Sequence, residues 1–469
     1  MTPVKLDTQS NLWNDALIHK YNMSGPRYTS YPTALQFRDN NHYSETEWLQ
    51  AVTQSQTINT DVSLYFHIPY CDTVCYYCGC NKIITANRTH AVKYLSYLKK
   101  EISQKAQHIG TAQRVTQIHF GGGTPTYLSD EQLEELLDHV NQHFNIDTQN
   151  LECAIEIHPQ TVNAERLERL RKMGFNRTSL GVQDFNPDVQ KAVNRFNSKE
   201  EVSAIIDAAN RLGFQSTSID LIYGLPLQTP ETFAVTLNDI IELDPDRLSL
   251  FNYAHMPHMF KTQRQIDTSQ LPEPQEKLQI LHQSIDTLRN NGYRFIGMDH
   301  FAKHSDELSI AQDNGTMQRN FQGYATGGGT DLHGFGLSSI SVLDNQYAQN
   351  IKQIDQYYQA IDDGKLPLKK GYVLNRDDEI RRKVINTLMC DFELNNSKLN
   401  EEFGIDVETY FEDELQNLQS MQQDGLIEIT PISIRVHTQG RLLIRSICQV
   451  FDAYSQAAPA DTPRYSRII

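Results

Sequence analysis

The sequence has no long run of apolar residues. Its 469 residues contain no stretch that approaches the roughly 18 consecutive apolar residues of a transmembrane helix. The first residues, MTPVKLDTQS, do not combine a basic start with an apolar block, so we expect no signal peptide. We therefore expect no membrane partner and a cytoplasmic location.

Positive charge is also scarce. The chain has 42 lysine and arginine residues against 58 aspartate and glutamate residues, which gives a formal net charge of -16. Binding to nucleic acid needs a basic surface, so we expect no nucleic-acid partner. An anionic small molecule is compatible with this charge only if a few local cations receive it.

Cysteine is the third scarce residue, with seven copies that are unevenly spread. Four of them lie within ten residues of each other, at Cys71, Cys75, Cys78 and Cys80. In a cytosolic chain such a group is typical of a metal site rather than of a disulfide framework. The other three are scattered, at Cys153, Cys390 and Cys448. Free cysteine is among the most buried residue types, so we expect these three to be buried.

An alternation of two patterns dominates the middle of the chain. Apolar, β-branched runs occur at 62–68, 115–120, 151–157, 177–182, 216–224 and 247–253. Segments with helical spacing lie between and after them, at 90–107, 130–143, 162–173, 199–212, 230–242 and 274–291. Six such repeats predict an α/β fold with parallel strands joined by right-handed crossovers. The repeats alone are compatible with an open barrel or with a doubly wound sheet.

The flanking segments complete a predicted division into residues 1–58, 59–345 and 346–469. The first is polar and irregular. Residues 292–345 are rich in glycine, which favours loop. Helical spacing returns in the last part, with a β-like stretch at 426–440 that suggests a hairpin. Such a winged hairpin can bind DNA, but no basic recognition helix accompanies it, which argues against that function.

The cysteine spacing points to iron–sulfur chemistry. Cys71, Cys75 and Cys78 follow the pattern C-x3-C-x2-C. Three thiolates can hold three irons of a cubane cluster and leave the fourth iron open to a small molecule. A structural zinc site would need a further pair of ligands, and on the cysteines alone it remains the alternative. Cys80 comes two residues after Cys78, so we do not expect it to reach the same cluster.

Polar residues gather where the predicted strands end. Ligands of parallel α/β folds bind at the carboxyl ends of the strands, and the cysteines directly follow the first strand. Residues at or near the ends of five strands are Tyr65, Glu156, Gln183, Asp220 and Ala254. These side chains are predicted to line a central pocket. A triple glycine follows the second strand, at 121–123, and lets backbone groups approach a ligand closely.

These features resemble the radical S-adenosylmethionine (SAM) superfamily, including Tyr77 before the third cysteine and GGGTPT at 121–126. Longer motifs are similar to the family of oxygen-independent coproporphyrinogen III oxidases. They are GPRYTSYP (25–32), HIPYCDTVCYYCGCNKI (67–83), GFNRTSLGVQDFN (174–186), VNR (193–195), IDLIYGLPLQTPE (219–231), FNYAH (251–255), GMDHFA (297–302) and RNFQGY (319–324). The similarity runs from about residue 20 to 451. His158 departs from it, because an acid is expected there.

The resemblance implies a six-fold partial barrel, a small helical C-terminal domain, one [4Fe-4S] cluster and two SAM molecules. The implied cluster ligands are Cys71, Cys75 and Cys78. The implied contacts of the first SAM are Tyr65, Gly122, Glu156 and Ile340. Those of the second are Tyr77, Gly123, Thr124, Gln183, Arg195, Asp220 and Ala254. These residue types suit SAM, because Arg195 can hold a carboxylate through two parallel hydrogen bonds and the acids can accept from ribose or amino groups.

The implied reaction is the oxidative decarboxylation of two propionates of coproporphyrinogen III to vinyl groups, which gives protoporphyrinogen IX. A 5′-deoxyadenosyl radical made from SAM takes the hydrogen atom. The resemblance further implies a flavodoxin or ferredoxin as electron donor, an unidentified electron acceptor and a monomer. Arg27 is expected to meet a substrate carboxylate from a lid at 25–32, and Cys80 is expected to serve turnover.

Two related families remain alternatives to this function. Haem chaperones share the three-cysteine motif but generally lack the fourth cysteine and the segment at 25–32. Haem-degrading relatives share more of the barrel. Cys80 and the segment at 25–32 are both present here, which favours the oxidase family.

Overall fold

The computed structural model describes residues 12–39, 42–58 and 61–455. No helix in these ranges is both long enough and apolar enough to cross a lipid bilayer. The three scattered cysteines, Cys153, Cys390 and Cys448, are buried, as the sequence predicts.

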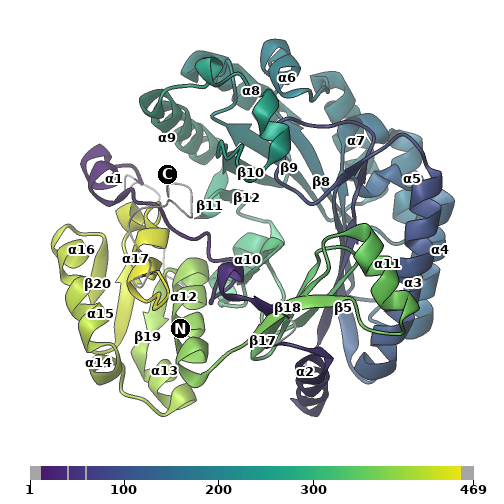
Figure 1. The fold of residues 1–469 in the computed structure, drawn as a ribbon. Helices are drawn as coiled ribbons and strands as arrows, with labels where there is room; N and C mark the ends of the chain where they lie inside the picture. The colour runs from purple at the N-terminus through teal and green to yellow at the C-terminus, as the bar shows by residue number, and fades with distance from the viewer. Residues whose placement is uncertain (1–11, 40–41, 59–60, 456–469) are drawn as a thin grey trace. The chain divides into compact units, whose positions relative to one another are not determined.

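The chain forms two compact units (Figure 1). Among the described residues, those within 37–292 and 329–373 form the barrel unit, and those within 12–36, 293–328 and 374–455 form the terminal unit. Both units therefore draw on separate stretches of sequence. The predicted division into residues 1–58, 59–345 and 346–469 follows the order of the chain, whereas the two units are defined by contacts. The predicted division stays a prediction.

Six parallel strands form the centre of the barrel unit. They are β2 (Val62–Ile68), β5 (Arg114–Gly122), β7 (Glu152–Ile157), β8 (Arg177–Gln183), β9 (Ser216–Tyr223) and β10 (Arg247–Asn252). Each pairs in parallel with the next. Their order in the sheet follows their order in the chain, without the reversal that defines a doubly wound sheet. The fold is therefore the partial barrel rather than the doubly wound alternative.

Six helices connect and follow these strands on the outer side of the curved sheet (Figure 1). They are α3 (Thr89–Ile109), α4 (Asp130–His143), α5 (Ala164–Lys172), α7 (Lys199–Leu212), α8 (Pro230–Leu243) and α9 (Pro274–Asn290). All twelve predicted strands and helices are confirmed to within two residues at each end. Local signals explain this accuracy. Capping boxes at Ser129 and Ser198 begin α4 and α7, and Gly213 in a left-handed conformation ends α7.

The prediction of loop for residues 292–345 is wrong for several stretches. In the barrel unit, β15 (Asp331–Phe335) pairs in parallel with β2, and β16 (Ile340–Leu343) pairs antiparallel with β15. β17 (Gln346–Asn350) and β18 (Leu368–Val373) extend this edge of the sheet. A Cβ on Gly334 would lie 2.9 Å from the backbone of Ile340. The glycine therefore permits close strand approach, which loop statistics do not reveal.

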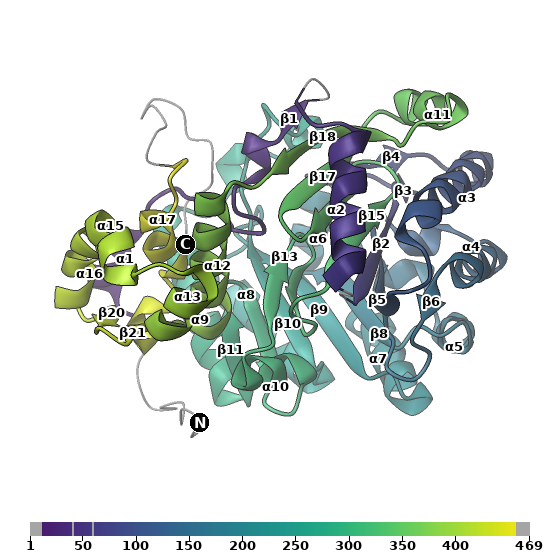
Figure 2. The same ribbon diagram turned by 90° about the horizontal axis from the view of Figure 1, so that it is seen from below.

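The expected irregular N-terminal segment is only partly irregular. The helix α2 (Glu45–Ile58) packs against α3 and β16 in the barrel unit (Figure 2). Its buried residues are Trp48, Ala51, Val52 and Ser55. These positions have helical spacing, but only two of them are strongly apolar. The sequence pattern is therefore weak, and tertiary packing stabilises the helix.

The terminal unit contains the expected C-terminal helices and hairpin. α12 (Arg376–Asp391) is its longest helix among the described residues, and β20 (Ile427–Ile429) pairs antiparallel with β21 (Ser433–Val436). The N-terminal segment packs within this unit. Arg445 donates hydrogen bonds to the carbonyl oxygens of Gly25 and Pro26, and the Tyr28 hydroxyl donates to Asp452 at 3.1 Å. Whether this segment covers the barrel mouth stays a prediction.

Candidate active site

The cysteine motif forms a closed loop directly after β2. Cys71 ends the short strand β3 (Tyr70–Cys71), which pairs with β4 (Ile83–Ile84). The N–H of Ile83 donates to the carbonyl of Pro69 at 2.7 Å, and this bond fastens the two ends of the loop together. In its middle, Asn194 donates through its side chain to the carbonyl of Val74 at 2.7 Å. The loop is thus held at its base and along its length.

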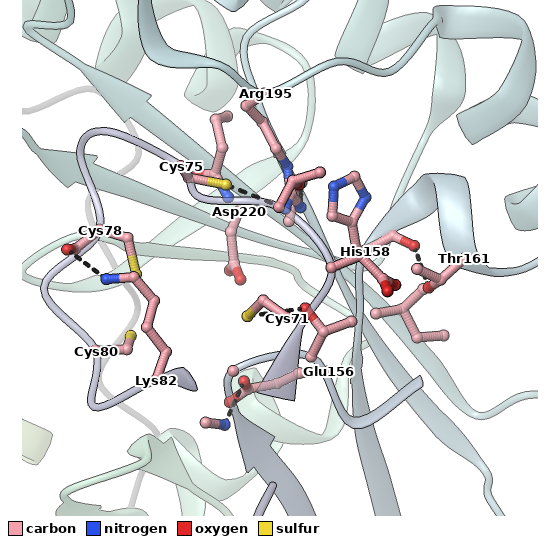
Figure 3. Close-up of a pocket in the computed structure, with 18 of the residues that line it drawn as sticks. Cys71, Cys75, Cys78, Cys80, Lys82, Glu156, His158, Thr161, Arg195 and Asp220 are labelled. Carbon is pink, nitrogen blue, oxygen red and sulfur yellow. Dashed lines mark hydrogen bonds between the residues drawn. The ribbon is translucent and has the colours of Figure 1, made fainter. Parts of the chain in front are cut away.

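A cavity of about 370 Å³ lies between this loop and the carboxyl ends of the strands (Figure 3). Most of the predicted site residues line it. They are Cys71, Cys75, Tyr77, Cys78, Cys80, Gly122, Gly123, Thr124, Glu156, Gln183, Arg195 and Asp220. Of the five predicted strand-end residues, Glu156, Gln183 and Asp220 therefore meet at one shared cavity, whereas the prediction that Tyr65 and Ala254 line it is wrong. The role of each residue is not thereby tested.

Each of the three motif cysteines has a hydrogen-bond donor near its sulfur. The Thr124 hydroxyl lies 3.4 Å from Cys71 Sγ, and Arg195 Nη1 lies 3.8 Å from Cys75 Sγ. The Cys80 thiol hydrogen-bonds to Cys78, which lowers the pKa of Cys78 to about 6. Donors of this kind stabilise the thiolate form that binds metal.

Burial opposes that charge at Cys71. It raises the pKa of the Cys71 thiol to about 11, although the hydrogen bond from Thr124 acts in the other direction. Within the described residues, no group of three or more His, Cys, Asp or Glu side chains is arranged to hold a single metal ion. The three cysteines lie on one cavity wall, and each sulfur has a hydrogen-bond donor near it. Soft thiolate ligands in this arrangement fit an iron–sulfur cluster.

A second group of contacts surrounds Glu156 on β7. Its carboxylate accepts a hydrogen bond from the N–H of Gly122 at 3.1 Å and lies 3.1 Å from His119 Nε2. Burial is the largest influence and raises the pKa of this acid, but the His119 contact, the Gly122 N–H and His67 together outweigh it and lower the pKa overall. The His119 ring also stacks on Tyr65, with 5.8 Å between ring centroids. Glu156 is therefore held as a carboxylate at the cavity wall.

Glycine is required beside this acid. Gly122 has a φ of +116°, and a Cβ there would lie 2.6 Å from the His67 ring. A Cβ on Gly121 would lie 2.6 Å from the Glu156 carboxylate. The triple glycine thus leaves room for the acidic and imidazole side chains of the protein itself. The predicted close approach of the glycine backbone to a ligand stays a prediction.

The opposite wall carries Arg195, Gln183 and Asp220. Arg195 is buried and donates to the carbonyl oxygen of Gly181, while its Nε has no hydrogen-bond partner in the described part of the chain. Gln183 Oε1 is likewise buried and unpaired among the described residues. Burial raises the pKa of Asp220 to about 6, and Ser179 donates to it at 3.1 Å. Buried polar atoms without partners fit a cavity that receives a polar ligand.

Four predicted residues do not line the cavity. Tyr65 lies on β2 and pairs across the sheet with Gly334, which contacts the backbone of Ile340. Ala254 follows β10 and accepts a hydrogen bond from Gln263. Arg27 belongs to the terminal unit, where it forms an ion pair with Asp299. The roles assigned to these residues stay predictions.

Several lining or supporting residues were not predicted from the sequence. His119 and Lys82 received no role, although His119 comes two residues before the triple glycine, at the end of a strand. His158 lines the cavity, and burial, with a contribution from Arg195, lowers its pKa to about 3. Its Nδ1 accepts a hydrogen bond from the N–H of Gln160 at 3.3 Å. The departure at His158 therefore puts a neutral imidazole on the cavity wall.

The fold and the cavity define a radical SAM enzyme. Residues 65–240 match the family model described as the radical SAM superfamily, and residues 374–443 match the HemN C-terminal domain. The first match spans the cysteine loop and five of the six barrel strands. The second begins where the chain enters the terminal unit for the last time.

Full-length relatives specify the enzyme further. Oxygen-independent coproporphyrinogen III oxidase from Salmonella typhimurium is 48% identical over 457 residues, which cover 97% of this chain and 98% of that protein. The Pseudomonas aeruginosa enzyme is 46% identical over 458 residues, which cover 97% of this chain and 99% of that enzyme. The solved structure of coproporphyrinogen III oxidase (HemN) from Escherichia coli, described as a radical SAM enzyme, superposes with a TM-score of 0.90 at 47% identity. That match covers 94% of this chain and 99% of the solved one. The chain belongs to the family of oxygen-independent coproporphyrinogen III oxidases.

Proposed function

We propose that this cavity performs the reaction for which the family is named. The enzyme oxidises coproporphyrinogen III without oxygen, removes carbon dioxide from two propionates and leaves two vinyl groups, so that the product is protoporphyrinogen IX. The observation that supports this most directly is that the three motif cysteines share one cavity with Glu156 and Arg195, at the strand ends of a partial barrel. Haem chaperone and haem-degrading activities are the alternatives.

The cofactors are one [4Fe-4S] cluster and two SAM molecules. Cys71, Cys75 and Cys78 would hold the cluster, because all three line the cavity and each has a donor near its sulfur. When bound, these groups supply one-electron reduction and a carbon radical that can take a hydrogen atom from the propionate β-carbon.

The residues of the cavity bind and orient. Arg195 can hold the carboxylate of a methionine moiety through two parallel hydrogen bonds. Glu156 and Asp220 can accept hydrogen bonds from amino or ribose hydroxyl groups, and the Tyr77 ring can stack on adenine. The backbone N–H groups of Gly123 and Thr124 instead donate to the carbonyls of Ile68 and Tyr70, so they fix the cavity wall.

The substrate needs local cations, because it carries four carboxylates and the chain is acidic. Arg27 is our candidate in the terminal unit, and a substrate carboxylate would replace Asp299 as its partner. Cys80 is exposed at the cavity and hydrogen-bonds to Cys78, so it can act near the substrate without being a cluster ligand. Both roles are part of the proposal.

Partners and location complete the proposal. A flavodoxin or ferredoxin supplies the electron for the cleavage of SAM, and an unidentified acceptor takes the electron that the substrate gives up as carbon dioxide leaves. The enzyme works as a monomer. All seven cysteines are free, which fits the reducing cytoplasm better than an oxidising compartment.

An anaerobic assay tests the proposal directly. Protein reconstituted with iron and sulfide, supplied with SAM and a reductant, should release two molecules of carbon dioxide per coproporphyrinogen III. Zinc without iron or sulfide in the purified protein would overturn the enzyme function. Haem binding without formation of vinyl groups would favour the chaperone instead.

A further inference from the structure

A short 3-10 helix, η4 (Lys261–Gln265), lies against the cysteine loop although it is far from it in sequence. The Thr262 hydroxyl donates to the carbonyl of Cys78 at 3.0 Å, and Gln263 Nε2 donates to the carbonyl of Tyr77 at 2.9 Å. The Phe260 ring, which directly precedes η4, lies 3.1 Å from where a Cβ on Gly79 would be. Three consecutive residues of the loop therefore contact this segment.

Gln263 makes the most of these contacts. Its side chain is 3% exposed. Besides Tyr77, Nε2 donates to the carbonyl of Ala254 at 3.2 Å, and Oε1 accepts from the N–H of Met256 at 2.6 Å. Glutamine has two amide hydrogens, and both are used, on carbonyls that belong to different parts of the barrel unit. A buried amide that is bonded at both ends holds its partners in one geometry.

The two carbonyls that share this amide belong to Tyr77 and Ala254. Tyr77 lies between two motif cysteines, and Ala254 follows β10. Both are among the residues expected around the second SAM. The distance between the cysteine loop at Tyr77 and the backbone after β10 at Ala254 therefore depends on the two hydrogen bonds from Gln263 Nε2.

We propose that Gln263 is a positioning residue for the second SAM, and that it sets the distance between the cysteine loop and the backbone after β10. The inference rests on the proposed function, since it requires two SAM molecules. Gln263 does not line the cavity, so it acts through Tyr77 and Ala254 rather than on the ligand.

Two substitutions separate positioning from simple packing. Gln263→Met keeps the length and apolar packing of the side chain but removes both donors and the acceptor. Gln263→Glu keeps the acceptor for Met256, and a carboxylate there repels the carbonyls of Tyr77 and Ala254. Once protonated, it can donate one hydrogen bond again, and burial favours the protonated form. Gln265→Met is the matched control, because Gln265 is exposed on the same 3-10 helix.

The measurements are iron and sulfide content and the number and affinity of bound SAM molecules, by anaerobic calorimetry of the reconstituted full chain. The Gln263→Met variant should keep the iron content of the wild type, because the three cysteines and the Thr262 contact remain. It should bind one SAM normally and the second roughly tenfold or more weakly, as expected for buried carbonyls that lose their donor. The Gln263→Glu variant should regain affinity for the second SAM as the pH falls, and Gln265→Met should match the wild type.

The outcomes distinguish this inference from the function on which it rests. Wild-type protein that binds fewer than two SAM molecules would overturn the two-SAM function and this inference with it. Two wild-type affinities in Gln263→Met would overturn the positioning role alone. Equal loss of iron and of both SAM molecules, with no pH-dependent recovery in Gln263→Glu, would also overturn it, since the residue would then be needed only for folding.

Discussion

His119 and Glu156 join the second and third barrel strands at the cavity wall. His119 Nε2 lies 3.1 Å from Glu156 Oε1. Burial alone would raise the pKa of Glu156, but this contact, together with the Gly122 N–H and His67, keeps the pKa below its ordinary value. Because the His119 ring also stacks on Tyr65, one imidazole contacts two residues that we expect around the first SAM.

We therefore predict that His119→Ala weakens binding of the first SAM. Without the imidazole, Glu156 loses the partner that most lowers its pKa, so the pKa rises and the carboxylate is lost at a higher pH than in the wild type. SAM affinity measured from about pH 5 to pH 8 should fall by roughly tenfold at the acidic end and recover as the pH rises. Gln117→Ala is the matched control. Gln117 lies two residues before His119 on β5, and its side chain makes a corresponding contact with Glu152 of β7 at 3.2 Å. A pH-independent affinity in His119→Ala would refute the prediction.

The motif cysteines and Cys80 should respond differently to substitution, because only the motif cysteines are predicted ligands of the cluster. Cys75→Ser should lose its iron and all cleavage of SAM, because a hard alcohol is a poor substitute for a soft thiolate. Cys80→Ser should retain the cluster, since Cys80 is not among the predicted ligands, but should lose porphyrinogen turnover. Iron and sulfide analysis beside the decarboxylation assay checks both. If Cys80→Ser lost iron as completely as Cys75→Ser, Cys80 would have to be a ligand.

The ion pair of Arg27 with Asp299 in the terminal unit leads to a third prediction. Arg27→Ala should lower turnover of coproporphyrinogen by about tenfold or more, because a lost charge-assisted pair costs about 1.5–3 kcal/mol. Iron content and SAM binding should be unchanged. Lys20→Ala removes the charge of another ion pair of the same unit, with Asp424, and should leave turnover unaltered. Full turnover in Arg27→Ala would mean that this arginine does not meet the substrate.

Asp220 should make the cluster-free protein less stable at neutral pH. Burial raises its pKa from 3.8 to about 6, so folding favours the protonated acid, and stability falls as the pH rises between these two values. Asp220→Asn should therefore raise the free energy of unfolding at about pH 7.5 by about 1–3 kcal/mol, and the gain should vanish below about pH 4. Urea unfolding at both pH values measures this. Asp207→Asn, at an exposed position of α7, is the matched control.

The same substitution should weaken SAM binding, because the amide has one acceptor oxygen and no charge, whereas the carboxylate has two charged acceptor oxygens for ribose hydroxyls or an amino group. If Asp220→Asn raises the free energy of unfolding and also weakens SAM binding, Asp220 serves ligand binding at a cost in stability. An Asp220→Asn protein that is less stable than the wild type at neutral pH would contradict the assignment of a buried charge.

The local sequence determined the repeated part of this fold. The apolar runs and helical segments from residue 62 to 291 have strong period-2 and period-3.6 patterns, and capping residues such as Ser198 mark their ends. The parallel strand order then brought Cys71, Glu156 and Asp220 to one cavity, because the carboxyl ends of such strands share an edge. Those predictions needed no long-range information.

Only the tertiary structure decided the contacts between distant segments. β15 pairs in parallel with β2. In the sequence its Gly334 indicates a loop, and only the folded chain shows that glycine is needed there because the neighbouring strand lies so close. In the same way, Gln263 is an ordinary polar residue in the sequence, and only the folded chain brings its amide to the carbonyls of Tyr77 and Ala254. Such contacts have no local periodicity, because they depend on which surfaces and backbone groups remain unpaired once the repeated strands and helices have formed.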